Sequence, residues 1–121
     1  MSYATVTLLE NIVEGIPSGN YDGSSLDFSS DPVEAAGYYQ GFGNIQTVTI
    51  RLTDFRGIVK LVGTLGDDPT QSAWFDIEEF DYTSSSTTLT IAPSYTGNFV
   101  WLRADIIDFV SGTINFITIS Y

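Results

Sequence analysis

The chain has 121 residues, of which 43% are hydrophobic and 14% aromatic, so one domain with a single substantial core is the simplest interpretation. Fifteen acidic residues against four basic ones give a formal net charge of −11, which excludes a phosphate-neutralising nucleic-acid surface and disfavours binding to anionic membranes. The chain contains no cysteine and no histidine, which excludes disulfides, thiolate zinc sites and a serine–histidine triad.

The sequence predicts neither a secretory signal nor a transmembrane segment. Residues 1–15 lack a basic region and a sustained apolar core. No apolar run approaches the roughly 20 residues that a membrane-spanning helix needs. A protein without a signal can still reach the outside of a cell when it is part of a particle released by lysis.

Short β-strands dominate the first third of the chain. Residues 3–9 are expected to form a strand at a sheet edge. Residues 10–44 are rich in glycine and proline, and they contain two brief strand-like pieces (26–28 and 37–42) and one helical turn over 31–36. Five aromatic residues indicate that this segment packs onto the core: Tyr21, Phe28, Tyr38, Tyr39 and Phe42.

The clearest pattern lies at residues 46–65, where apolar residues alternate with polar ones as in half-buried strands. Residues 54–57 are expected to be the turn of a hairpin that joins the two halves. Gly63 falls on the apolar face, which indicates a close approach of the backbone or a bulge. The expected core positions are Val48, Ile50, Leu52, Val59, Leu61 and Leu65.

The rest of the chain continues the β pattern. Residues 74–77 begin a strand, and the serine- and threonine-rich residues 83–88 are expected to form a hairpin loop. Residues 98–105 carry apolar side chains on both faces, which is typical of a central strand. Residues 106–112 turn the chain, and 113–121 form the closing strand. Seven or eight strands at about ten-residue spacing predict an all-β fold, a single antiparallel β-sandwich.

Four ordered segments follow a shared pattern: F-x-G at 55–57, GTL…PT…WFD over 63–76, GNFVWLRA at 97–104 and FVSGTINFIT at 109–118. Together they resemble small virion structural domains of marine contractile-tailed bacteriophages, cyanophages in particular. The resemblance implies a jelly-roll sandwich similar to galactose-binding-like domains. It also implies a place in the virion, assembled in the host cytoplasm, with other virion proteins or further copies of the chain as partners. Arg56 departs from the pattern, where a small polar residue is expected, and the resemblance does not reach residues 10–44.

The segment 10–44 carries oxygen ligands of the kind that calcium prefers. Galactose-binding-like jelly rolls often hold a structural calcium in an early loop, which makes Asp22 and Asp27 candidate metal ligands. The loop lacks the alternating acids of an EF-hand. A solvated acidic loop is the other interpretation, and no further cofactor is expected. The oxygen-bearing residues are Asn20, Asp22, Asp27, Asp31 and Glu34.

A glycan is a second candidate ligand, because sugars stack on exposed aromatic rings and bond to neighbouring polar groups. Tryptophan in a β-sandwich is nevertheless more often part of the core than a binding platform. The candidate ligand-binding residues are Tyr38, Tyr39, Trp101, Arg103 and Asp105.

Catalysis finds little support in the sequence. Asp76 and Glu78 are two apart on a predicted strand, so they could share a face at the spacing of glycosidase carboxylates, roughly 5 to 10 Å. Acids on the solvent face of a strand are the default, however, and the sequence predicts a protein that is not an enzyme.

Three of the four basic residues lie close together in the sequence, at Arg51, Arg56 and Lys60. In a strongly negative chain they could pair with acids of a neighbouring subunit or with acids of their own sheet. The sequence therefore predicts a non-enzymatic structural or accessory protein of a phage particle (head decoration, tail or fibre) that acts through subunit contacts. The alternative is a carbohydrate-binding module used for host attachment.

Overall fold

The computed structural model describes residues 5–39, 45–70 and 73–121, apart from the side chain of Tyr39. Its architecture is an antiparallel network of eight strands with one turn of helix, α1 (Ala36–Tyr39), within these ranges. The strands are β1 (Thr5–Val13), β2 (Phe28–Ser29), β3 (Val33–Glu34), β4 (Ile45–Thr64), β5 (Phe75–Asp81), β6 (Thr87–Ile91), β7 (Ser94–Thr96) and β8 (Trp101–Ser120).

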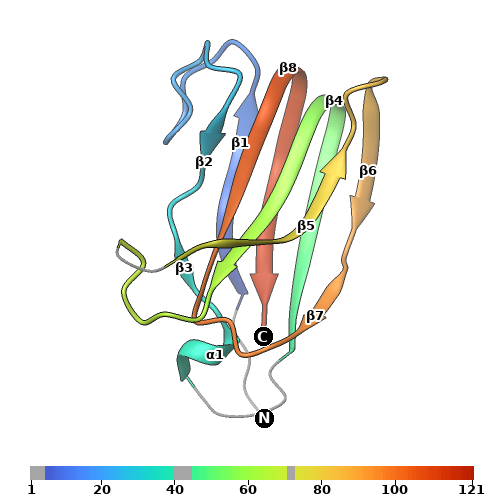
Figure 1. Cartoon of the computed structure of the whole chain (residues 1–121). Helices are drawn as coiled ribbons and strands as arrows, with labels where there is room; N and C mark the ends of the chain where they lie inside the picture. Colours follow the sequence, from blue (N-terminus) through green and yellow to red (C-terminus); the bar gives the residue numbers. More distant parts are fainter. Residues whose placement is uncertain (1–4, 40–44, 71–72) are drawn as a thin grey trace.

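Strands β4 and β8 form one long antiparallel ribbon that folds over at its middle. Thr47 lies opposite Ser120 at one end of the ribbon, and Thr64 lies opposite Trp101 at the other. The register shifts between these ends, over residues 51–58. Figure 1 shows both strands rising to the bend and returning from it. Each strand therefore contributes one half to each of two layers.

The bend depends on backbone conformations that few residues adopt. Asp54 on β4 has φ 51°, and Asp108 and Gly112 on β8 have φ 54° and 94°. A Cβ added at Gly112 would lie 2.2 Å from the carbonyl oxygen of Asp54. Glycine is therefore required where the two strands cross from one layer to the other.

The two layers are four strands wide. Sheet I consists of β1, the second half of β8, the first half of β4, and then β6 followed by β7. Sheet II consists of β2 and β3, the first half of β8, the second half of β4, and β5. A ribbon folded between two sheets in this way is the organisation of a jelly roll. The predicted all-β antiparallel sandwich is confirmed.

The core lies between the sheets, and the alternation of β4 predicted most of it. Five of the six expected core residues of β4 and its end are at most 2% exposed: Val48, Ile50, Leu52, Val59 and Leu61. Leu65 is 63% exposed, which corrects the prediction, because β4 ends at Thr64 and the chain leaves the sheet there. Gly63 faces Ile77 and Leu102 so closely that an added Cβ would lie 2.8 and 3.0 Å from their side chains, as its apolar position predicted.

An aromatic cluster fills the core below the bend. The Phe55 and Phe109 rings stack with centroids 5.5 Å apart, and the Tyr21 ring lies 5.3 Å from Phe109. Phe28 packs 4.9 Å from Tyr21, whose hydroxyl accepts a hydrogen bond from the Gly15 N–H. The prediction that aromatic residues of the segment 10–44 pack onto the core is confirmed for Tyr21 and Phe28.

Both predicted hairpins are wrong. The two halves of residues 46–65 pair with β8 in different sheets rather than with each other. Of residues 83–88, the first four likewise connect β5 of sheet II to β6 of sheet I, and the last two belong to β6. Alternation of apolar residues identifies a strand and its buried face, whereas the partner of that strand depends on contacts distant in the sequence.

The short elements of the segment 10–44 also differ from the prediction. Val33 and Glu34 form β3, where a helical turn over 31–36 was expected, and α1 begins only at Ala36. Of the expected strand over 37–42, residues 37–39 belong to α1 and the others lie outside the described residues. Within the described ranges no helix is long and apolar enough to cross a membrane.

Candidate functional site

Ion pairs cover the outer face of sheet II, which we call the charged face (Lys60, Asp76, Glu79, Arg103 and Asp105). The Lys60 Nζ lies 3.1 Å from an Asp76 carboxylate oxygen and 3.8 Å from Glu79. The hydrogen bond to Asp76 and the charge of that carboxylate raise the pKa of Lys60. Arg103 Nε lies 2.9 Å from Asp105. The pairs of Lys60 join β4 to β5, and the pair of Arg103 and Asp105 lies within β8, so Lys60 has its partners within the chain.

A loop crosses the charged face and is attached to it by two tryptophans. The Trp101 indole N–H donates to the Asp67 carbonyl at 3.1 Å, and the Trp74 N–H donates to the Pro69 carbonyl at the same distance. The Arg103 guanidinium carbon lies 4.6 Å from the centre of the Trp74 ring. Figure 1 shows the chain crossing in front of β8 and β4 before it enters β5.

The structure brings four of the five candidate glycan ligands to this face. Tyr38 packs edge-on against Trp101 with centroids 5.4 Å apart, and Arg103 is bound to Asp105. The side chain of Tyr39, the fifth, lies outside the described residues. Because both indole N–H groups and the guanidinium already have partners within the chain, a sugar would have to compete with these contacts for hydrogen bonds.

The two acids that could have formed a catalytic pair have different partners. Asp76 is bound by Lys60, whereas Glu78 accepts a hydrogen bond from the hydroxyl of Tyr95 on β7. A bulge lies between the β5 positions opposite Leu61 and Val62, which alters the alternation of the strand. Burial, and then the hydrogen bond to Glu78, raise the pKa of the Tyr95 hydroxyl.

The candidate calcium ligands each bind the backbone of the chain. Asp22 accepts hydrogen bonds from the backbone N–H groups of Ser24 and Ser25 at 2.8 and 2.7 Å, and Asp27 accepts one from the Asp108 N–H at 3.1 Å. Within the described part of the chain, no three carboxylates gather into a group that could hold a metal ion. Both acids therefore act in the structure as acceptors that shape turns.

The turn at Asp22 is expected to loosen at low pH. The N–H groups of Ser24 and Ser25 lower the pKa of Asp22 from 3.8 to about 2. Because the folded value is depressed, the stabilisation is complete above about pH 4 and is lost as the pH falls through about 2. Amide chemical shifts of Ser24 and Ser25, measured by NMR from pH 5 to pH 1.5, should follow this low midpoint.

Asp22→Asn should remove the titration from both amides, and Asp67→Asn, in an exposed loop outside this turn, should leave it unchanged. A midpoint near pH 4 for the Ser24 and Ser25 amides of the unmodified protein would contradict the role given to Asp22.

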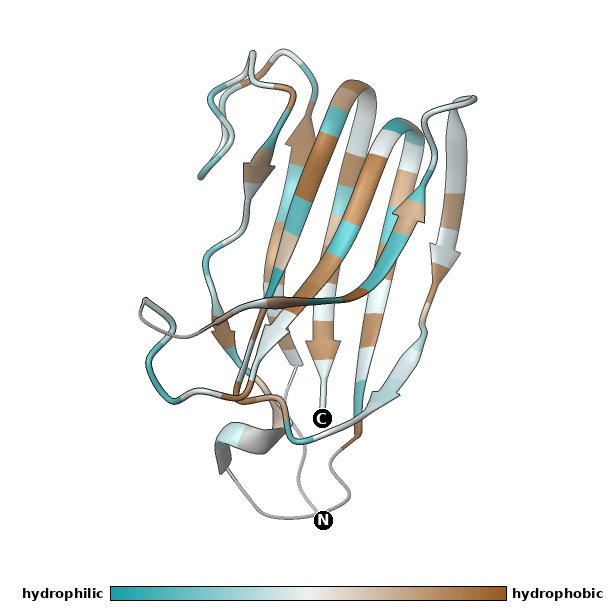
Figure 2. Ribbon diagram, in the orientation of Figure 1, coloured by the Kyte–Doolittle hydropathy of each residue, from teal (hydrophilic) through white to brown (hydrophobic). Residues whose placement is uncertain are grey.

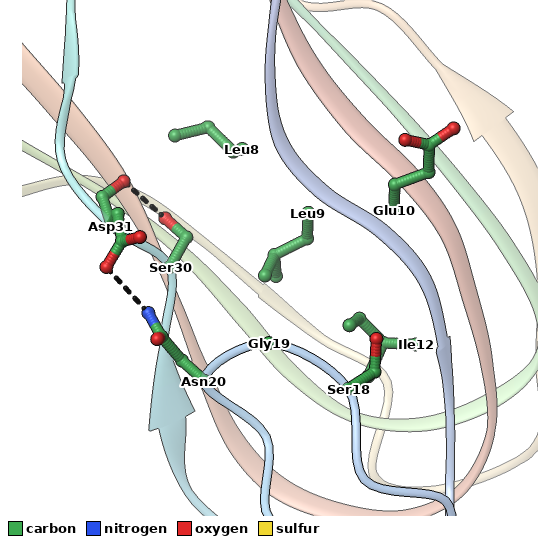
Figure 3. A pocket seen from close by; sticks show the side chains of 9 residues that line it. All are labelled: Leu8, Leu9, Glu10, Ile12, Ser18, Gly19, Asn20, Ser30 and Asp31. Carbon is green, nitrogen blue, oxygen red and sulfur yellow. Dashed lines mark hydrogen bonds between the residues drawn. The ribbon is translucent and has the colours of Figure 1, made fainter.

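A cleft opens between β1 and the loops beside it, with a cavity volume of about 160 Å³. Leu8, Leu9 and Ile12 form its apolar floor, and Glu10, Asn20 and Asp31 are among the polar residues around it. In Figure 3 the Asn20 amide points to Asp31, to which it donates at 2.9 Å. An apolar floor with a polar rim is the composition of a ligand site, although most such sites exceed roughly 300 Å³.

The outer face of sheet I is dominated by short side chains that carry hydroxyl groups. In one row across the sheet, Thr5 bonds to Ser120 at 3.0 Å between their hydroxyl oxygens, and Thr47 bonds to Ser94 at 2.7 Å. In Figure 2 residues of intermediate hydropathy (white) alternate with hydrophobic residues (brown) along the second half of β8 and along β6, whereas hydrophilic residues (teal) are frequent in sheet II. We call this surface the hydroxyl face: Thr5, Thr7, Thr47, Thr49, Thr53, Thr90, Ser94, Thr118 and Ser120.

One row of the hydroxyl face differs from the others. Glu10, Phe116 and Arg51 lie side by side on β1, β8 and β4. Glu10 and Arg51 are exposed and Phe116 is half-buried. Apart from Asp54 at the bend, which bonds to the Thr88 hydroxyl, Glu10 and Arg51 are the only charged side chains that the described strands of sheet I carry on this face, and no ion pair involves either of them within the described ranges.

The three candidate interface residues are therefore separated by the fold. Arg51 lies on the hydroxyl face, and Lys60 lies on the charged face of the opposite sheet. Arg56, at the bend, donates to the Thr83 carbonyl at 2.8 Å. The expectation that Arg51 and Lys60 lie on paired strands was wrong, because the two halves of β4 belong to different sheets.

Comparisons with known proteins support no family assignment. No family model matches the chain, and no curated protein matches it. One solved structure that matches is CBM35 from Paenibacillus barcinonensis, at 14% sequence identity and a TM-score of 0.39, with 98% of each chain covered. A TM-score this low carries no argument about function, so the fold rests on the strand pairing described above.

Sequence reasoning did not find the row of Glu10, Phe116 and Arg51 or the role of Trp74. The alternation of threonine or serine with apolar residues is visible in the sequence at 5–7, 47–49 and 118–120. That these three stretches share one face follows only from the register of β1, β8 and β4. Such a surface is assembled from segments as far apart as the two ends of the chain.

Proposed function

We propose that the chain is a non-enzymatic structural or accessory domain of a phage particle, in a head decoration, tail or fibre, and that it acts through contacts with other subunits. The observation that carries the contact role is the hydroxyl face, a nearly uncharged surface four strands wide on a chain of net charge −11. The place in a particle is supported by the resemblance of the segments between residues 55 and 118 to virion structural domains.

The charge distribution favours the hydroxyl face over the charged face as a contact surface. Acids repel the acids of any similarly charged neighbour, and the described strands place only two acids on the hydroxyl face, Glu10 and, at the bend, Asp54. Short hydroxyl side chains lose little conformational freedom when they are covered, and they can exchange hydrogen bonds with a partner. The charged face, by contrast, is crossed by the chain's own loop.

Catalysis is not part of this proposal. Asp76 and Glu78, the two acids closest to a glycosidase pair in the sequence, are bound by Lys60 and Tyr95 on different sheets. The hydrogen bond from the half-buried Tyr95 to the exposed Glu78 joins the edge strands of the sandwich, and that is a structural role.

The test is the composition of intact particles. Mass spectrometry and immunogold labelling of purified particles should detect the chain, and Thr49→Lys or Thr118→Lys should reduce its incorporation by placing a long charged side chain on the hydroxyl face. Ser84→Lys, in an exposed loop, is the matched control and should be incorporated normally. Absence of the chain from particles, or equal incorporation of all three variants, would refute the proposal.

A carbohydrate-binding module for host attachment is the second candidate, and the cleft beside β1 favours it. Its floor of Leu8, Leu9 and Ile12 could take the apolar face of a sugar, while Asn20 and Asp31 offer amide and carboxylate oxygens. Binding on a broad glycan array that is lost in Asn20→Leu and kept in Ser84→Lys would support this function. A flat response of the unmodified protein would exclude it.

A further inference from the structure

We propose that the hydroxyl face is the contact surface of a two-fold symmetric dimer of this chain, in which Arg51 of each copy pairs with the partner's Glu10. This inference rests on the subunit-contact role proposed above and names the partner as a second copy. It is carried by the row of Glu10, Phe116 and Arg51, which places opposite charges at equal distances from one aromatic ring.

The spacing of the row follows from the strand pairing. Glu10 lies opposite Phe116, and Phe116 lies opposite Arg51, on three neighbouring antiparallel strands. Neighbouring strands are about 4.8 Å apart, so the Cα atoms of Glu10 and Arg51 are separated by roughly 10 Å with Phe116 midway. Because Glu10 and Arg51 are exposed and lack an ion pair among the described residues, both are available to a partner.

Symmetry and charge together select one arrangement. A two-fold axis that runs parallel to β8, between two facing sheets and above Phe116, reverses the order of the strands in the second copy. Arg51 then faces the partner's Glu10, Glu10 faces the partner's Arg51, and the two Phe116 rings meet at the centre. An axis at right angles to the strands would instead set like charge against like charge, which is unfavourable.

The size of the face indicates a reversible dimer. Sheet I is four strands wide and β1 is nine residues long, which corresponds to roughly 600 Å² per copy. Stable interfaces bury about 800 Å² per partner, so the dimer should be weak and should form at the high local concentrations of an assembly. The acids of the charged face lie on the far side of each copy, which reduces the repulsion between two chains of charge −11.

The test is a set of charge reversals followed by sedimentation equilibrium over a range of concentrations. The unmodified chain should show a reversible monomer–dimer equilibrium. Glu10→Arg and Arg51→Glu should each weaken dimerisation by about tenfold or more, because each sets like charges against each other. The double variant Glu10→Arg/Arg51→Glu, with the net charge of the unmodified chain, should restore the dissociation constant to within about threefold.

Glu14→Arg is the matched control, because it changes the net charge as Glu10→Arg does from an exposed position beyond the end of β1. It should leave dimerisation intact or strengthen it. Circular dichroism and thermal unfolding of every variant should match the unmodified chain, which separates lost contacts from lost folding.

The inference is overturned if the unmodified chain stays monomeric at about 1 mM, or if the double variant dimerises no better than either single variant. These outcomes are distinct from failure of the particle role. A monomeric chain found in purified particles refutes the dimer and leaves the particle role standing. If the chain dimerises and the double variant restores dimerisation, but the chain is absent from particles, then the dimer stands and the particle role is refuted.

Discussion

Gly112→Ala should destabilise the protein by more than about 3 kcal/mol, beyond the range of most single substitutions. Gly112 has φ 94°, and an added Cβ would lie 2.2 Å from the Asp54 carbonyl oxygen and 2.6 Å from the Phe55 Cα, so backbone on both strands of the ribbon would have to move. Because small domains are stable by only about 5–15 kcal/mol, a large fraction of the variant should be unfolded or insoluble. Chemical denaturation and the yield of soluble protein measure this effect.

Gly15→Ala isolates the contribution of the backbone conformation. Gly15 has φ 89°, close to that of Gly112, but an added Cβ would have nothing within 4 Å. The conformational strain alone should cost roughly 1 kcal/mol or somewhat more. If the two variants were equally stable, the close approach of β4 and β8 at the bend would be irrelevant to stability.

Phe109→Ala should cost about 3–5 kcal/mol, the usual range for removing a buried phenylalanine ring. Phe109 is 1% exposed, and its ring packs against Phe55, Tyr21 and Phe28 from β4, the loop after β1 and β2. The cavity would separate elements that come from three distant parts of the chain. Denaturant unfolding should show the loss, and amide exchange should show faster opening of residues 14–30.

Val110→Ala is the control for this substitution, since Val110 follows Phe109 directly on β8 and is 49% exposed. Its cost should stay below about 1 kcal/mol, because much of the side chain is in water in both states. Equal losses for Phe109→Ala and Val110→Ala would show that the aromatic cluster does not hold the bend to the core.

The buried faces of the strands could be predicted from the sequence because they depend on a period of two within one segment. Val48, Ile50 and Leu52 are all at most 1% exposed, as their alternation indicated. Phe55 was assigned to a turn, yet it is fully buried, because the turn is a bend through which the ribbon changes sheets. No local pattern distinguishes such a bend from a hairpin, since both need residues that tolerate positive φ.

The candidate sites were less accessible to sequence reasoning than the core. The spacing of two between Trp101 and Arg103 showed that they share a strand face. It did not show that Trp101 donates a hydrogen bond to Asp67 or that Arg103 lies against the ring of Trp74. The row that contains Arg51 depends on Glu10, which lies 41 positions earlier in the chain and was expected just beyond the first strand. Surfaces formed by several strands require their register, and register follows from the whole fold.

The position of β8 has a consequence for the way the chain reaches its native state. Residues 113–120 lie between β1 and β4 in sheet I, so β1 has no neighbour until the last strand has been synthesised. The ribbon joins residues as distant as Thr47 and Ser120, and proteins dominated by such non-local pairing fold in milliseconds to seconds. Folding of sheet I therefore requires that β8 has been synthesised, and the exposed edges of β1 and β4 are open to association with other chains until β8 arrives.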